Sequence, residues 1–124
     1  MTDRGDKILV LDKRIESESL ARLVREGFGD MVKFVVDVER GIAAVGGELH
    51  ADGEQLLLDS GSSPAALWGA NYYPGRGPEK CIEFTALINI RPARGNPGME
   101  VSDAGLRTRI QSIARELLGK GEVL

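Results

Sequence analysis

An apolar residue at every second position between Met31 and Val38 constrains the fold of this chain more than any other feature. Successive side chains of an extended strand leave it on opposite sides, so this alternation predicts a strand with one apolar face. That face consists of Val32, Phe34, Val36 and Val38. Because such a face has to be covered, the chain is predicted to fold around a β-sheet.

The residues that follow predict that the chain turns back as a hairpin. Glu39, Arg40 and Gly41 form a short loop in which glycine can take a positive φ. The return strand, from Ile42 to about Gly47, is rich in alanine and glycine. Small side chains there allow a helix or a ligand to approach the backbone closely.

Turn residues and apolar periodicity divide the rest of the chain into further elements. Helices are expected to start at Glu16 or Ser17, at Asp52, and at Ser102 or Asp103, with side-chain oxygens capping their first turns. Further strands are expected at 7–13, 66–73 and 81–91. The last of these, Cys81 to Arg91, is the longest expected strand, and its apolar face consists of Ile82, Phe84, Ala86, Ile88 and Ile90.

This order of elements predicts an α+β fold, with a mostly antiparallel sheet built from two hairpins and about three helices packed on it. Each helix has one apolar stripe, so the helices are expected to cover one sheet face and leave the second face partly exposed. The chain of 124 residues is near the common size of one domain. A single globular domain over residues 1–124 is therefore expected, with residues 1–6 frayed.

Charge and composition argue against several classes of protein. The net charge of -3 gives no electrostatic basis for binding nucleic acid or an anionic membrane. No apolar run approaches the ~20 residues of a membrane span, and the first residues lack the apolar core of a signal peptide. Cys81 is the only cysteine, which excludes an internal disulfide and fits a reducing cytoplasm. We therefore expect a cytoplasmic protein without membrane partners.

The stretch from Gly46 to Asp52 holds the only histidine, His50, with Glu48 and Asp52 two residues to either side. A carboxylate beside a histidine can orient the ring for acid–base catalysis, so these three residues are the candidate catalytic set. The same side chains could hold a divalent metal, although their spacing matches no known metal motif. In the alternative interpretation, Asp52 only caps a helix and His50 only bonds to backbone.

A second candidate set consists of polar residues that share one face of the expected strands. It comprises Asn71, Glu83, Asn89 and Arg91, which could bind a small anionic substrate, since the planar guanidinium of arginine suits carboxylate or phosphate. In the alternative, Arg91 forms a structural ion pair with a neighbouring acid. Trp68 and Tyr72 are expected in the core rather than in a stacking platform.

With these residues in view, the chain resembles a small family of uncharacterised prokaryotic proteins. The resemblance covers roughly residues 16 to 118, and Gly-Gly-Glu-Leu-His-Ala-Asp at 46–52 is its most specific part. It implies a domain of unknown function and brings no reaction, cofactor or catalytic residue. The other segments that carry it are Phe28–Lys33, Val36–Glu39, Leu67–Pro74 and Ile88–Pro92.

Two functions follow from these features. The first is a binding or regulatory domain with its polar site around Glu48, His50 and Asp52, which could also form a homodimer through the open sheet face or an edge strand. The second is a small acid–base or metal-assisted hydrolase acting on an anionic substrate. The hydrolase requires His50 to share one concave pocket with Glu83 or Arg91.

Overall fold

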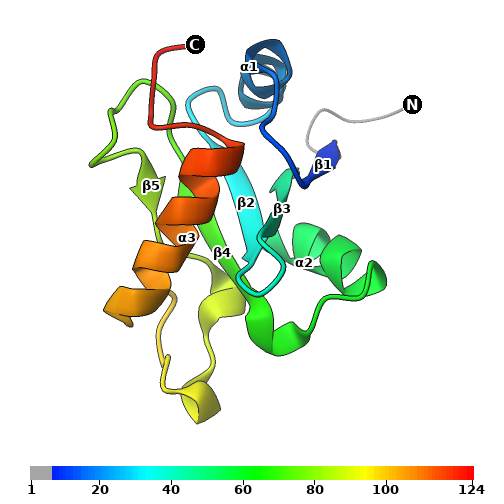
Figure 1. Ribbon diagram of the computed structural model, residues 1–124, viewed down its shortest axis with the longest axis vertical. Helices are drawn as coiled ribbons and strands as arrows, with labels where there is room; N and C mark the ends of the chain where they lie inside the picture. The colour runs from blue at the N-terminus through cyan, green and yellow to red at the C-terminus, as the bar shows by residue number, and fades with distance from the viewer. Residues whose placement is uncertain (1–6) are drawn as a thin grey trace.

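The alternating stretch is strand β2 (Val32–Asp37), the central strand of a five-stranded sheet (Figure 1). The computed structural model describes residues 7–124. Within them the sheet is antiparallel throughout, in the order β1-β3-β2-β4-β5. The other strands are β1 (Ile8–Leu11), β3 (Ile42–Gly46), β4 (Leu67–Tyr72) and β5 (Ile82–Glu83), and the α-helices are α1 (Ser17–Glu26), α2 (His50–Asp59) and α3 (Ala104–Leu117). The predicted α+β fold is therefore confirmed.

One face of the sheet carries the larger apolar core. Val32, Phe34 and Val36 of β2 point into it, as their alternation predicts. Helix α1 contributes Leu20, Leu23 and Val24, and helix α3 contributes Ile110, Ile113, Ala114 and Leu117. Trp68 and Tyr72 of β4 are buried in the same core, as expected from the sequence.

Helix α2 packs on the opposite face, so the expectation that all helices share one face is wrong. Figure 1 shows α2 and α3 on opposite sides of the strands. Leu57 of α2 is fully buried against Val35 and Leu67. A Cβ added at Gly53 would lie 3.3 Å from the Cβ of Ala44, so small residues on both elements permit the close approach. Amphipathicity marks a buried stripe on a helix but does not say which sheet face it covers.

The expected strand over 81–91 is also wrong beyond its first residues. Only Ile82–Glu83 pairs with β4, and the chain then turns into the short 3-10 helix η3 (Leu87–Asn89). The side chain of Asn89 takes the place of a strand at the edge of β4. Its Oδ1 accepts from the Gly69 N–H and its Nδ2 donates to the Gly69 carbonyl, both over 2.9 Å. A side-chain amide thus satisfies the backbone groups that a longer β5 would have paired.

Two of the three predicted helix caps are also wrong. Asp103 accepts a hydrogen bond from the Leu106 N–H over 2.7 Å and caps α3 as expected. Helix α1 follows Glu16 without a side-chain cap. Helix α2 follows Leu49, which places Asp52 inside the first turn instead of before it. The positive φ angles of Gly46 and Gly47 turn the chain early, so α2 starts two residues before Asp52.

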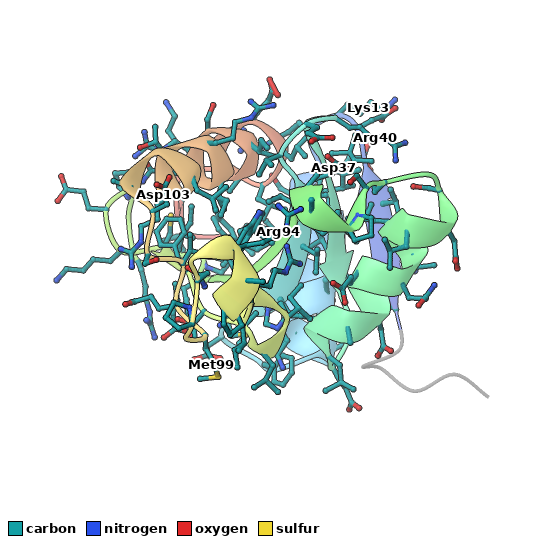
Figure 2. The ribbon with its side chains drawn as sticks, turned by 90° about the horizontal axis from the view of Figure 1, so that it is seen from below. Lys13, Asp37, Arg40, Arg94, Met99 and Asp103 are labelled. Carbon is teal, nitrogen blue, oxygen red and sulfur yellow. The ribbon has the colours of Figure 1, made fainter. Side chains whose placement is uncertain are left out.

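A buried carboxylate holds the end of the hairpin between β2 and β3. Figure 2 shows Asp37 and Arg40 close together at this end of the sheet. Asp37 accepts from the N–H groups of Glu39 and Arg40, both over 2.9 Å, and from the Ser62 hydroxyl over 2.6 Å. Because Ser62 follows α2, this carboxylate ties the far end of that helix to the sheet.

No helix within residues 7–124 is long and apolar enough to cross a membrane. All five strands within residues 7–124 belong to one sheet, and helices pack on both of its faces, so this part of the chain is a single domain. Residues 1–6, which were expected to be frayed, lie outside the described part.

Candidate functional site

A pocket of about 300 Å³ opens beside the first turn of α2, on the sheet face that this helix covers. Its walls come from β2, β4, the start of α2 and the segment after β5. Most of its lining is apolar, which is typical of sites that bind small molecules. The lining residues are Lys33, Leu49, His50, Ala51, Asn71, Ala86, Leu87 and Ile88.

The strand register places three polar side chains in a row across this face. Lys33 of β2 lies opposite Asn71 of β4, and Asn71 lies opposite Glu83 of β5. Residues directly opposite each other in a sheet share a face and interact. The Asn71 amide donates to Glu83 Oε1 over 2.8 Å, and the Tyr73 hydroxyl donates to the same oxygen over 3.2 Å.

Asn71 is the least satisfied of these groups. Its side chain is buried, with 7% of the residue exposed, and its amide nitrogen is fixed by Glu83. The carbonyl oxygen, Oδ1, is buried without a hydrogen-bond partner among the described residues. A buried acceptor without a partner costs about 1–3 kcal/mol, so an unpaired one in a pocket wall marks a place for a donor.

His50, the first residue of α2, is half-buried and fixed by the backbone of β4. Its Nε2 lies 2.9 Å from the Ala70 carbonyl oxygen, which can only accept, so Nε2 carries the proton. Burial lowers the pKa of His50 below 6.5; the nearby Lys33 ammonium also lowers it, while the Ala70 carbonyl and the Asn71 side chain oppose this shift. Near neutral pH the ring is therefore neutral, with its lone pair on Nδ1.

The structure does not bring the two neighbouring carboxylates to His50. Glu48 and Asp52 are both exposed, and neither makes a hydrogen bond to the ring. Glu48 contributes its main-chain carbonyl instead, which accepts from Lys33 Nζ over 2.7 Å. No group of three His, Cys, Asp or Glu side chains within residues 7–124 is arranged to hold a metal ion.

The second candidate set is divided between three places. Asn71 and Glu83 belong to the row beside the pocket, whereas Asn89 is fully buried and engaged with the backbone of Gly69 and Met99. Arg91 lines a different pocket of about 430 Å³, near Arg94, which Figure 2 labels. Arg91 Nε donates to the Ile88 carbonyl over 3.2 Å.

Further contacts explain the position of Arg91. Its guanidinium lies 4.6 Å from the centre of the Trp68 ring and 3.6 Å from Glu54 Oε2. The ion pair with a neighbouring acid is therefore present, with Glu54 of α2 as the partner. His50 and Arg91 do not share a pocket, and Glu83 reaches the pocket of His50 only through its bond to Asn71.

Sequence reasoning missed Lys33 and the apolar wall formed by Leu87 and Ile88. The alternation from Met31 to Val38 does place Lys33, as a polar residue, on the second face of that predicted strand. Its position opposite Asn71 depends on the pairing of β2 with β4, which lie far apart in the sequence. The wall depends on the turn after β5, which the alternating pattern of 81–91 conceals.

The family described as "Protein of unknown function (DUF5674)" matches residues 9–117 of this chain. No curated protein and no solved structure matches the chain significantly.

Proposed function

This chain is a member of the DUF5674 family, whose function is unknown, and we propose from the geometry of its pocket that it is a binding domain for a small ligand. The pocket beside the first turn of α2 is the binding site. The observation that carries this proposal is Asn71, which lines this largely apolar pocket and whose buried Oδ1 has no hydrogen-bond partner within residues 7–124. His50 and Lys33 supply the other polar groups, and Leu49, Leu87 and Ile88 supply the apolar surface.

Binding is favoured over hydrolysis by the way His50 is held. A general base needs a lone pair aimed at a substrate and a partner that orients the ring, and a carboxylate partner also stabilises the imidazolium that forms. Here a backbone carbonyl orients the ring, and Glu48 and Asp52 are exposed. The hydrolase alternative would require both carboxylates to move toward His50, or a metal ion to draw the three side chains together.

The test is an NMR screen that uses the single histidine as its reporter. The probes are fragment-sized neutral, cationic and anionic compounds, together with Zn²⁺, Mn²⁺ and Mg²⁺. We expect organic probes to shift the His50 ring protons and the Ile88 methyl signals together, and metal ions to leave the ring unchanged. Probes that shift neither signal, or only those of the Arg91 pocket, would overturn the proposal. Metal-dependent broadening of the His50 ring would support the hydrolase instead.

The same proposal includes a cellular compartment, an oligomeric state and a sequence signature of the family. The lone Cys81, buried and with its thiol pKa raised by burial, supports a reducing cytoplasm. Among residues 7–124 no strand pairs with the outer edge of β1, and this edge supports a homodimer, which light scattering would detect. The string from Gly46 to Asp52 is proposed as a signature of prokaryotic members of the family.

A further inference from the structure

We propose that the pocket binds a small apolar carboxylate that carries a hydrogen-bond donor next to the carboxylate. This is the chemistry of an apolar α-amino acid or of the C-terminal residue of a peptide. The inference rests on the proposed binding function and adds the class of ligand. Three parts of the pocket support it, one for each part of such a ligand.

The carboxylate would bind between Lys33 and the first turn of α2. Lys33 Nζ donates to the Glu48 carbonyl and lies 5.1 Å from the centre of the Phe28 ring, which leaves it N–H donors for a ligand. Leu49, the N-cap of this ten-residue helix, offers no side-chain hydrogen bond to the first turn. Uncapped N–H groups and the positive end of a helix dipole both favour an anion. Leu49, His50 and Ala51 of this turn all line the pocket.

The hydrogen-bond donor would meet Asn71 and His50. Asn71 Oδ1 is a buried acceptor without a hydrogen-bond partner among the described residues, and Asn71 is one of the residues that line this pocket. Nδ1 of the neutral His50 ring is a second acceptor, because Nε2 is engaged with the Ala70 carbonyl. The Glu83 carboxylate behind Asn71 favours a positively charged donor, such as an ammonium group, over a neutral one.

The apolar part of the ligand would cover side chains that are now open to solvent. Leu87 is 71% exposed and Leu49 is 57% exposed, and they lie in the walls of one pocket. Burial of exposed apolar surface stabilises a complex by roughly 25 cal/mol per Å² before the costs of association. A pocket of about 300 Å³ is at the small end of ligand sites and suits one amino-acid side chain rather than a large cofactor.

Four probes that share the carbon skeleton of leucine test the carboxylate and the hydrogen-bond donor of the proposed ligand separately. They are L-leucine, N-acetyl-L-leucine, L-leucinamide and 4-methylpentanoate, each titrated by calorimetry and followed at the His50 ring by NMR. We expect L-leucine or N-acetyl-L-leucine to bind, the first indicating a free amino acid and the second a peptide C-terminus. Leucinamide lacks the carboxylate and 4-methylpentanoate lacks the donor, so each should bind about tenfold more weakly or not at all.

Two variants and one control place the binding in this pocket. Lys33→Gln should weaken binding of the tightest probe about tenfold or more. Lys80 is an exposed lysine in the loop before β5, and Lys80→Gln should leave binding unchanged. Leu87→Ser alters a surface side chain, so it should fold normally and weaken binding about three- to tenfold.

The inference is overturned if leucinamide or 4-methylpentanoate binds as tightly as the tighter of L-leucine and N-acetyl-L-leucine, or if neither Lys33→Gln nor Leu87→Ser changes the affinity. It is also overturned if none of the four probes shifts the His50 ring. A fragment of another class that does shift the ring would then preserve the binding function and exclude only this ligand class. If no probe of any class shifts it, both proposals fail.

Discussion

The two faces of the sheet are held in different ways. Toward α1 and α3, nineteen buried apolar residues of the described chain form one cluster. Toward α2 the corresponding cluster has four, Val35, Ala44, Leu57 and Leu67. Buried polar side chains supplement it there, with Asp37 bonded to Ser62, Asn89 to Gly69 and Asn71 to Glu83.

This difference shows where a binding site can form on so small a domain. Apolar packing gives stability in proportion to area and leaves no group to recognise a ligand. Hydrogen bonds between buried polar groups contribute less net stability, but they fix side chains in defined positions. The pocket lies on the polar face, where one such group, Asn71, is only half satisfied.

The largest expected difference comes from removing the same side chain on each face. Leu117, on the α3 face, and Leu57, on the α2 face, are both almost fully buried. We expect Leu117→Ala to lower the free energy of unfolding by about 4–5 kcal/mol, since its densely packed surroundings cannot collapse into the cavity. Leu57→Ala should cost about 2–3 kcal/mol. Urea denaturation measures both, and equal losses would contradict the comparison.

The second prediction tests whether polar contacts hold the α2 face. Asn89→Ala leaves the N–H and carbonyl of Gly69 without their partners, which should cost about 2–4 kcal/mol. Hydrogen exchange at the Gly69 amide should also become faster. Gln55→Ala is the control, because that exposed amide bonds only to Asp59 on its own helix and should cost about 0.2–0.5 kcal/mol. A loss from Asn89→Ala as small as that of the control would refute this role.

A smaller effect is expected where the pocket wall meets β4. A Cβ at Gly69 would lie 2.7 Å from the Cβ of Ala86 and 3.0 Å from Cδ2 of His50. Gly69→Ala should therefore cost about 1–3 kcal/mol by overpacking and should displace both walls of the pocket. Adding Ala86→Gly removes the closest contact and should restore part of the stability. Strictly additive effects of the two substitutions would show that this contact does not limit the packing.

The smallest effect concerns the protonation of His50. Burial lowers its pKa in the folded state below the value of 6.5, so the unfolded chain binds a proton more readily. The neutral ring therefore makes its full contribution to the free energy of unfolding above pH 6.5. This contribution is lost as the pH falls below 6.5 and through the lower pKa of the folded state. Unfolding measured between about pH 8 and pH 5 should show a loss for the native chain that His50→Gln lacks. The same pH dependence in both proteins would exclude His50 as its source.

Local patterns in the sequence determined the elements that one periodicity describes. The alternation from Met31 to Val38 gave β2, the stripe of Leu20, Leu23 and Val24 gave α1, and Asp103 gave the start of α3. These signals are reliable because each depends on residues a few positions apart. The α+β class followed from their order, without knowledge of any long-range contact.

The tertiary structure alone decided which groups meet. The alternation of 81–91 predicts a strand, but Asn89 bonds to the edge of β4 and ends the pairing after Glu83. The spacing of Glu48, His50 and Asp52 suggests a triad, but the helix starts at His50 and leaves both carboxylates in solvent. The partners of His50 come instead from β4 and β2. Strand register and the choice of sheet face are set by contacts between distant segments, and these contacts leave no periodic trace in the sequence.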